Sequence, residues 1–362
     1  MYIIQKITKV FKTFVISLTI KDKTISLLPQ NIERILIIKL RAIGDVLLST
    51  PVIQNLRTQF PNAQIDFLTE KFASEVVIGN PYLNDVITFN KKTESSVSLI
   101  KKARSQKYDV VIDLFGNPRS ALLTKLSGAK FRIGFPFRVR KFAYNILVTP
   151  RGNEVHNVEF NLDVLRKLEI PIHATQPYFP IVKEAEQFAQ DWISHYKDGK
   201  MLIALNAGGG WYTKKWSVEN FAGLAKTITK KYQAFFVILW GPGEKDDALK
   251  LEKFIGNNSI IIPPTTLSQM GAILRQCSYL ISNDSGPMHI AATLQIPTLG
   301  IFGPTNPYLQ GPYGKQHQWI RHEELECIAC NLTSCSIGNI CMKDLSVKKV
   351  FEAFDKLLKQ NS

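Results

Sequence analysis

The chain has 362 residues, enough for about two domains, and 45% of them are hydrophobic, enough to give each domain its own core. This composition excludes a disordered, collagen-like or disulfide-scaffolded chain. The 45 Lys and Arg residues against 30 Asp and Glu residues give a formal net charge of +15. We therefore expect an anionic partner, and nucleic acid, a phosphorylated substrate and an anionic membrane surface are all candidates.

Residues 1–32 form a basic leader. Apolar residues recur at helical spacing over residues 3–18, beside Lys6, Lys9 and Lys12. No uncharged apolar run approaches the roughly 20 residues that cross a bilayer, and no small-residue cleavage site follows. The pattern predicts either a helix that lies on an anionic membrane surface or a helix that docks on the following domain.

Residues 33–180 are expected to form a first α/β domain. Short apolar runs typical of buried strands alternate there with amphipathic stretches typical of helices. The expected strands are 35–40, 64–70, 85–90 and 108–116, and the expected helices are 45–60 and 95–107. Because such alternation produces βαβ units, we expect a parallel sheet.

The same alternation restarts in residues 181–345, which are expected to form a second Rossmann-like domain. The expected strands are 201–210, 234–243, 259–264, 279–286 and 298–305, the expected helices are 218–232 and 267–277, and residues 346–362 hold a C-terminal helix. A proline-rich segment, 170–182, is the expected linker. Ligands of open α/β sheets bind at the carboxyl ends of the strands, so the expected site lies in the cleft between the domains.

The loop after the first strand offers a carboxylate to this cleft. Gly44 relaxes the backbone, and Asp45 follows it in the first turn of a helix. An aspartate at that position is most often an N-terminal cap or a partner of the helix dipole. The alternative role for Asp45 is a general base that takes a proton from a substrate hydroxyl.

One loop of the second domain has the features of a diphosphate site. Asp284, Ser285 and Gly286 follow a strand and precede a helix that carries His289. Unpaired amides at a helix start favour an anion. A capping role for Asp284 or Ser285, and a half-buried packing role for His289, are the structural alternatives.

Two further loops suit a nucleotide-sugar. Three glycines follow residues 201–207 and precede Lys214 and Lys215, which allows close backbone approach and supplies positive charge for phosphate oxygens. Glu244 lies beyond another strand, where a carboxylate can accept hydrogen bonds from sugar hydroxyls, although a solvated loop residue is the more frequent case. Together the loops predict a divided site, with the nucleotide on the second domain and the acceptor on the first.

Residues 129–145 have the character expected of an acceptor-binding segment. Basic residues alternate there with aromatic residues, and no acidic residue intervenes; the basic ones are Lys130, Arg132, Arg138, Arg140 and Lys141. Such a segment suits an anionic sugar-lipid, or single-stranded nucleic acid bound by stacking. The structural alternative is a surface hairpin with a solvated basic face.

Six motifs, in their order and spacing, resemble the glycosyltransferase family 9 heptosyltransferases. They are RAIGDVLLSTP (41–51), DLFGNPRSA (113–121), KKWS (214–217), WGPGE (240–244), NDSGPMHIAA (283–292) and GIFGPTNP (300–307). The resemblance covers about residues 33–345, and the basic leader lies outside the usual start of the family. It implies a GT-B fold, in which two Rossmann-like parallel-sheet domains face each other across a cleft.

The resemblance also implies an activity and roles for residues. Members move heptose from ADP-heptose to the lipopolysaccharide inner core at the cytoplasmic face of the membrane, and relatives with other sugars share the motifs. Asp45 is implied as the catalytic base. Donor-binding roles are implied for Lys215, Glu244, Asp284, Ser285, Gly286 and His289. We expect Arg132, Arg138, Arg140 and Lys141 to bind the acceptor.

Four of the five cysteines lie close together in the sequence. Cys327, Cys330, Cys335 and Cys341 have a spacing that many relatives carry after the donor loop. Four thiolates can hold one Zn²⁺ in tetrahedral geometry, so a structural zinc site is possible; two thiol pairs or a packed reduced cluster are alternatives. So few cysteines indicate a reducing compartment.

The sequence thus predicts an inverting, metal-independent glycosyltransferase that needs no catalytic cofactor. Its expected partners are a nucleotide-sugar donor, an anionic glycolipid acceptor and the anionic inner face of the inner membrane. Alternatives are a transferase of the same family with another nucleotide-sugar, or a sugar-nucleotide epimerase of related fold. A nucleic-acid-binding protein would account for the charge but would leave the donor loops unexplained.

Overall fold

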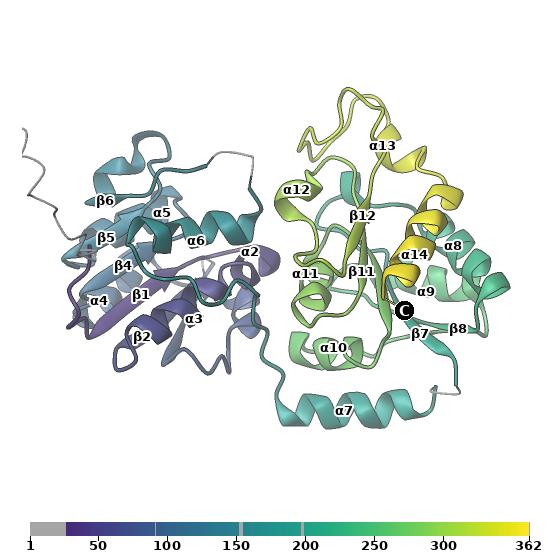
Figure 1. Ribbon diagram of the computed structural model, residues 1–362, viewed down its shortest axis with the longest axis horizontal. Coiled ribbons are helices and arrows are strands. Elements are labelled where there is room, and N and C mark those ends of the chain that lie inside the picture. The colour runs from purple at the N-terminus through teal and green to yellow at the C-terminus, as the bar shows by residue number, and fades with distance from the viewer. Residues whose placement is uncertain (1–26, 91, 152–154, 197–198, 362) are drawn as a thin grey trace, which may run out of the picture.

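A computed structural model describes residues 27–90, 92–151, 155–196 and 199–361. Figure 1 shows two α/β domains side by side, with the N-terminal half in purple and blue and the C-terminal half in green and yellow. The amphipathic helix expected within the leader lies outside the described residues. None of the described helices is long and apolar enough to cross a membrane.

The N-terminal domain is built on a parallel sheet with the strand order β3-β2-β1-β4-β5-β6. The strands are β1 (Arg34–Ile38), β2 (Gln64–Glu70), β3 (Asp85–Phe89), β4 (Val110–Asp113), β5 (Phe131–Gly134) and β6 (Ile146–Leu147). Residues 35–38 of β1 are fully buried because helices cover both faces of the central strands.

Short helices connect these strands. They are α2 (Ile43–Leu47), α3 (Thr50–Gln59), α4 (Ser96–Ser105), α5 (Pro118–Leu126) and α6 (Asn157–Lys167), with the 3₁₀ helices η1 (Lys71–Val76) and η2 (Arg138–Ala143). The single helix expected over 45–60 is interrupted between α2 and α3. There the Ser49 hydroxyl donates to the Val46 carbonyl oxygen at 2.7 Å, and Pro51 lies in the first turn of α3.

The C-terminal domain repeats the design with the strand order β12-β11-β10-β7-β8-β9, again all parallel. Its strands are β7 (Met201–Asn206), β8 (Ala234–Ile238), β9 (Ser259–Ile261), β10 (Tyr279–Asn283), β11 (Thr298–Ile301) and β12 (Gln318–Ile320). Its helices are α7 (Lys183–Ser194), α8 (Val218–Lys231), α9 (Lys245–Ile255), α10 (Leu267–Leu274), α11 (Gly286–Thr293), α12 (Pro307–Gln310), α13 (Ile340–Lys343) and α14 (Val347–Asn361), with the 3₁₀ turn η4 (Tyr212–Lys214). Two parallel sheets covered by helices confirm the predicted α/β class.

The segment 129–145 differs from the hairpin considered above. β5 and β6 pair in parallel, with Ile133 opposite Ile146. A parallel pair needs a crossover, and η2 supplies it. The aromatic and basic residues of the segment therefore lie partly on β5, next to the edge strand, and partly on η2, and not on the two strands of a hairpin.

Candidate active site

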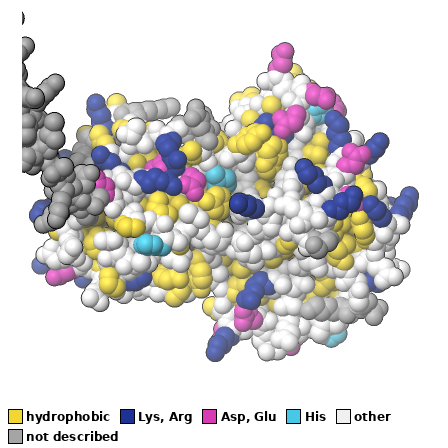
Figure 2. Space-filling view, in the orientation of Figure 1, with side chains coloured by type: hydrophobic (Ala, Val, Ile, Leu, Met, Phe, Trp, Pro, Cys, Tyr) yellow, Lys and Arg dark blue, Asp and Glu magenta, His cyan; other side chains and the backbone are white. Residues whose placement is uncertain are grey.

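A cavity of about 320 Å³ lies where the two domains meet. Figure 2 shows the molecular outline notched at this boundary, and α2 and α11 lie against each other across it (Figure 1). The lining residues that carry the argument below are Gly44 and Asp45 from the first domain and Trp211, Lys214, Asp284, Ser285, Gly286 and His289 from the second. The structure thus brings five of the seven predicted catalytic and donor residues into one cavity.

Asp45 both caps its helix and faces the cavity. Its Oδ2 accepts a hydrogen bond from the Ala42 amide at 3.0 Å, which satisfies one of the free donors at the start of α2. No described residue donates to its other oxygen, Oδ1. The capping role is therefore present in the structure, and it leaves one carboxylate oxygen available to a ligand in the cavity.

A half-buried lysine, Lys39, lies near Asp45. Lys39 Nζ donates to the Leu114 carbonyl oxygen at 3.0 Å. Burial lowers the pKa of Lys39, and the carboxylates of Asp45 and Asp113 act against that shift. Lys39 therefore links the β1 loop that carries Asp45 to the loop after β4.

Asp113 organises the loop after β4. Its carboxylate accepts hydrogen bonds from the Phe115 and Gly116 amides, at 3.0 and 2.9 Å, and from the Tyr144 hydroxyl at 2.8 Å. Burial raises the pKa of Asp113, and these hydrogen bonds oppose the shift. We assigned no role to this residue from sequence, although an acidic residue at the end of a strand in the DLFGNPRSA motif was a visible signal.

Asp284 is buried at the floor of the cavity. Its Oδ2 lies 2.7 Å from Lys214 Nζ and accepts a hydrogen bond from the Thr305 hydroxyl at 2.7 Å. Neither partner was assigned to Asp284 from sequence. A charged pair with so little exposure to water needs this additional hydrogen bond to be tolerated, and it fixes Lys214 within the cavity.

Ser285 and Gly286 start helix α11. The Ser285 hydroxyl accepts a hydrogen bond from the Asn206 side chain at 2.7 Å and donates to the Asn283 carbonyl oxygen at 3.1 Å. It makes no side-chain cap, and no other described side chain is recorded as accepting a hydrogen bond from the amides at the start of α11. An added Cβ on Gly286 would lie 3.1 Å from Ile43 Cγ2 of the other domain, which shows how closely the domains approach here.

The His289 ring of the C-terminal domain lies close to the loop that carries Asp45. An added Cβ on Gly44 would lie 2.4 Å from His289 Cδ2, so only glycine fits at position 44 without movement. Burial lowers the pKa of His289, and the Asp284 and Asp45 carboxylates oppose the shift. Two buried nitrogens beside the cavity, His289 Nδ1 and Trp211 Nε1, have no hydrogen-bond partner among the described residues. Such atoms suit a bound polar ligand.

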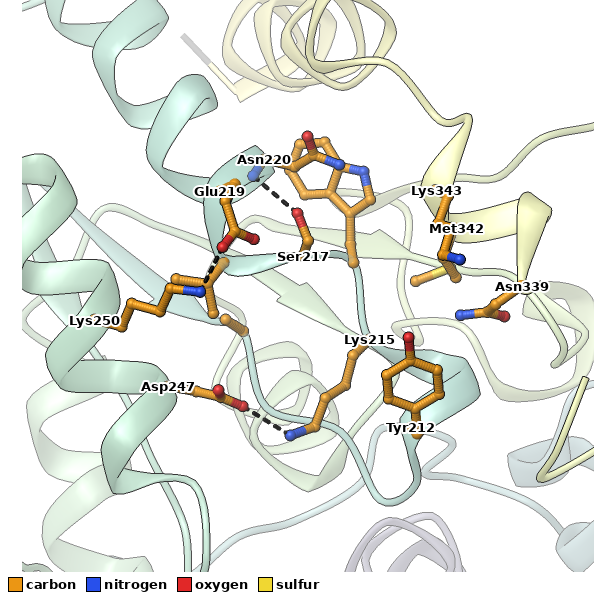
Figure 3. A pocket seen from close by; sticks show the side chains of 13 residues that line it. Tyr212, Lys215, Ser217, Glu219, Asn220, Asp247, Lys250, Asn339, Met342 and Lys343 are labelled. Atoms are coloured by element: carbon orange, nitrogen blue, oxygen red, sulfur yellow. Dashed lines mark hydrogen bonds and ion pairs between the residues drawn. The ribbon is translucent and has the colours of Figure 1, made fainter.

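Lys215, the predicted donor residue, points away from this cavity. Its Nζ lies 3.0 Å from Asp247 of α9, in a second cavity of about 510 Å³ on the C-terminal domain (Figure 3). The charges there are largely paired, since Lys250 also forms an ion pair with Glu219. The 3₁₀ turn η4 ends at Lys214, so the side chains of Lys214 and Lys215 point in different directions. The geometry favours Lys214 over Lys215 for contact with a ligand in the interdomain cavity.

Glu244 joins two glycine loops outside the lining of that cavity. Its carboxylate accepts hydrogen bonds from the Gly209 amide at 2.9 Å and the Gly241 amide at 3.0 Å. An added Cβ on Gly208 would lie 2.2 Å from the carboxylate, so this close approach requires glycine. Glu244 therefore shapes the glycine loop that precedes Lys214, and its role toward a ribose stays a prediction.

The predicted acceptor residues lie away from the interdomain cavity. The Arg132 guanidinium donates to the Ala129 and Ala143 carbonyl oxygens, at 2.7 and 3.1 Å, so it holds β5 to η2. Lys141 is exposed and Arg140 is half-buried, while the side chain of Arg138 is outside the description. None of these described side chains lines the cavity.

A basic pocket that the sequence reasoning missed lies in the N-terminal domain. It encloses about 420 Å³ at the carboxyl ends of β2 and β3, and its lining includes Lys71, Phe72 and Lys92 together with one acidic residue, the buried Glu70. The Phe72 ring is 52% exposed there, which leaves it free to contact a ligand. The carboxyl ends of parallel strands share one edge of a sheet, so this pocket and the Asp45 loop lie along the same edge.

The four clustered cysteines do not form a metal site as they are placed. Cys341 is buried, Cys335 is half-buried, and Cys327 and Cys330 are exposed. Burial raises the pKa of the Cys341 thiol to about 11, and the three other thiols add to the shift. Within the described part of the chain, no group of three or more His, Cys, Asp or Glu side chains is arranged to hold a metal ion. Zinc binding therefore stays a prediction.

Comparison with known proteins identifies the family. The model of glycosyltransferase family 9 (heptosyltransferase) matches residues 96–341. Lipooligosaccharide heptosyltransferase 2 of Campylobacter jejuni is 24% identical over 87% of this chain and 96% of its own length. Lipopolysaccharide heptosyltransferase 3 of Escherichia coli is 27% identical over 75% of this chain and 83% of its own length.

Solved structures agree with the fold. A family 9 glycosyltransferase from Veillonella parvula superposes with a TM-score of 0.81 at 24% identity, over 92% of this chain and 99% of its own. The E. coli heptosyltransferase WaaC with ADP superposes with a TM-score of 0.71 at 20% identity, over 90% of this chain and 99% of its own. These neighbours confirm the predicted two-domain GT-B architecture, and the family match covers most of the chain. The chain belongs to glycosyltransferase family 9, the heptosyltransferases.

Proposed function

We propose that the protein transfers a heptose from ADP-heptose to a lipopolysaccharide-core acceptor, with inversion at the anomeric carbon. The observation that supports this most directly is the shared cavity. The Asp45 carboxylate of one domain faces a lysine, a helix N-terminus and two buried nitrogens of the other that have no hydrogen-bond partner among the described residues. That arrangement suits a hydroxyl nucleophile on one side and a diphosphate leaving group on the other.

Asp45 acts as the general base in this proposal. Its Oδ1 accepts the proton of the acceptor hydroxyl while that oxygen attacks the anomeric carbon from the side opposite the nucleotide. The hydrogen bond that the Ala42 amide donates to Oδ2 holds the carboxylate in place. Correct placement is the first requirement of a general base. Lys39 lies close enough for the Asp45 carboxylate to oppose the lowering of its pKa by burial.

The second domain stabilises the charge that develops on the leaving diphosphate. Lys214 contributes an ammonium group, and the start of α11 contributes amides and the positive end of the helix dipole. Asp284 is a positioning residue that holds Lys214. Because these groups carry positive charge already, the transfer is proposed to proceed without a divalent metal or another catalytic cofactor.

The acceptor is proposed to bind on the N-terminal domain. Its anionic groups would contact the basic pocket at Lys71 and Lys92, together with the basic residues that follow β5, including Arg140 and Lys141. Since lipopolysaccharide precursors carry a lipid anchor, the protein would work at the cytoplasmic face of the inner membrane, as a peripheral protein.

Product analysis tests the proposal. The protein is incubated with ADP-heptose and heptose-deficient lipopolysaccharide, and the product is examined by mass spectrometry and by NMR of the new glycosidic bond. One added heptose with the inverted configuration, formed equally well in EDTA, is expected. Transfer from a different nucleotide-sugar, or epimerisation of the donor without transfer, would contradict the proposal.

A further inference from the structure

One surface of the N-terminal domain gathers exposed apolar side chains. Among the described residues it holds Leu122, Leu126, Val139, Phe142 and Leu147, each between 39% and 81% exposed. Leu122 and Leu126 are one turn apart on α5, and Val139 and Phe142 are one turn apart on η2. Helices α5 and η2 pack against each other, and α5 and the edge strand β6 both lie on the upper side of this domain in Figure 1. We call this set of five residues the α5–η2 surface.

These residues are exposed although η2 is firmly attached. Ala121, Ala143 and Tyr144 form a small buried cluster between α5 and η2. The Tyr144 hydroxyl donates to buried Asp113, and the Arg132 guanidinium donates to the Ala143 carbonyl oxygen. The side of η2 that faces α5 is therefore already packed, and Val139 and Phe142 lie on its solvent-exposed side.

The same stretch of chain is strongly basic. Between Asp113 and Glu154 the sequence contains eight Lys and Arg residues and no acidic residue, so it carries eight of the fifteen net positive charges. Lys125, Lys130 and Lys141 are exposed and take part in none of the described ion pairs. An occupant of the α5–η2 surface must accept apolar side chains and be negatively charged.

We propose that the α5–η2 surface docks the protein on an anionic phospholipid bilayer, with Val139 and Phe142 inserted at the level of the headgroups and the lysines against lipid phosphates. A bilayer surface offers an apolar interior and negative charge together. Nucleic acid offers the charge, but four of the five side chains of this surface are aliphatic and cannot stack on bases. The chain's own leader, with one acid among its first 32 residues, and a second copy of this surface are both positively charged, so repulsion disfavours either.

The inference concerns a surface beside the proposed acceptor-binding residues, since η2 carries Arg140 and Lys141 as well as Val139 and Phe142. It needs neither donor nor acceptor, so vesicle binding tests it even if the proposed sugar transfer proves wrong. It also gives a reason for the position of the surface, since η2 follows the carboxyl end of β5, at the sheet edge that carries Asp45. A bilayer held there brings a lipid-anchored acceptor toward the cavity.

Quantitative binding of the full-length protein to vesicles tests the inference. The vesicles contain either phosphatidylcholine alone or phosphatidylcholine with 30 mol% phosphatidylglycerol. The surface variant is Val139→Ser with Phe142→Ser, and the matched control is Leu249→Ser with Ile337→Ser, two exposed apolar residues of the other domain. We expect the surface variant to bind anionic vesicles about tenfold more weakly, and the control to stay within twofold of the wild type.

Charge is tested separately. Lys125→Gln with Lys130→Gln is expected to weaken binding to anionic vesicles by about fivefold per lysine, with little effect on neutral vesicles, and the difference should shrink in 1 M salt. Circular dichroism and melting temperature show whether each variant is folded. Equal vesicle affinity of folded wild type and folded Val139→Ser/Phe142→Ser would overturn the inference. So would lipid-free self-association that this variant abolishes while vesicle affinity stays constant, since the surface would then join copies of the chain.

Discussion

The two domains present their polar groups to the cleft in opposite ways. On the C-terminal side the groups already bind one another: Asp284 holds Lys214, Asn206 holds Ser285, and Glu244 holds the glycine loop. On the N-terminal side Asp45 keeps an oxygen without a described partner, and the lysines of the basic pocket form no described ion pair. A network built in advance suits a donor of constant chemistry, because its reorganisation cost on binding is small. Unpaired, exposed charges suit an acceptor that differs between relatives.

The largest expected effect comes from removing the base. Asp45→Asn keeps an oxygen that can accept the Ala42 amide, but an amide cannot take a proton. Transfer should fall by about 10²- to 10⁴-fold, whereas ADP affinity and melting temperature should stay close to those of the wild type. Turnover, calorimetric titration with ADP and thermal melting measure the three quantities. Activity within threefold of the wild type would return Asp45 to a purely capping role.

A smaller effect, on ADP affinity, is expected when the C-terminal domain loses the positive charge of Lys214. Lys214→Met combined with Asp284→Asn removes both charges of the buried pair, so no unpaired charge remains, and the Thr305 hydroxyl can still donate to the oxygen of the introduced amide. ADP should bind about 10- to 100-fold more weakly, which is the usual value of a charge-assisted hydrogen bond. Calorimetric titration with ADP measures the change.

Lys215→Met is the matched control for that variant. Its ammonium pairs with Asp247 at the other cavity, and this partner is partly exposed, so ADP affinity should change by less than about threefold. If Lys215→Met weakened ADP binding more than the Lys214 variant did, the donor diphosphate would have to lie on the Lys215 side of the glycine loop.

The contact between Gly44 and His289 at the domain interface should have an intermediate effect on turnover. Gly44→Ala places a methyl group 2.4 Å from His289 Cδ2, so the domains must separate, the Asp45 loop must move or the His289 ring must turn. We expect kcat/KM to fall by about tenfold. Gly223→Ala is the control, because an added Cβ there lies on α8, away from the cavity, and meets only the Val347 side chain, with Cγ2 at 3.3 Å. Equal kinetics of the two variants would show that His289 and Gly44 separate during the reaction without cost.

A last effect concerns the pH dependence of stability at the same domain interface, and not turnover. His156 Nδ1 accepts the Val158 amide, so Nε2 carries the proton and donates to the Gly311 carbonyl oxygen of the other domain at 3.0 Å. Burial lowers the pKa of His156 to about 4. A histidine with a lowered pKa stabilises the fold at neutral pH, and this contribution is lost as pH falls from about 6.5 to 4, by up to about 3 kcal/mol.

His156→Gln tests that contribution, because glutamine keeps an N–H donor but does not titrate. Melting temperature is measured at pH 7, 6 and 5 for both proteins. The wild type should lose more stability than the variant on acidification, since His289 and His317, whose pKa values burial also lowers, remain in both. Parallel curves would show that the ring of His156 stays neutral or stays solvated over this range.

The sequence was sufficient for features set by local pattern. The apolar runs at β1 and β10 and the loops after them, which hold Gly44 and Gly286, located both sheets and most of the cavity, because central parallel strands are buried on both faces and have continuous apolar runs. Edge strands carry a weaker pattern. β6 has only two residues, and it left the 129–145 segment open to interpretation as a hairpin.

Features that depend on tertiary contacts could not be predicted from the sequence. Lys214 and Lys215 are neighbours of the same type, and only the end of the η4 turn decides which one enters the cavity. The approach of His289 to Gly44 joins residues 245 positions apart, in different domains. No local pattern encodes such a contact, which is why Lys215 was predicted and the fit of the two domains was not.

The missing side chain at position 44 has a consequence for protein engineering. Enzymes made of an acceptor half and a donor half are natural candidates for hybrids that combine halves from two relatives. In this chain the two halves are complementary in shape. The His289 imidazole of the donor half occupies the space that a methyl group on residue 44 of the acceptor half would fill. A hybrid that unites this donor half with an acceptor half bearing any larger residue at that position would fold both halves yet close imperfectly. Position 44 and position 289 should therefore be transplanted as a pair.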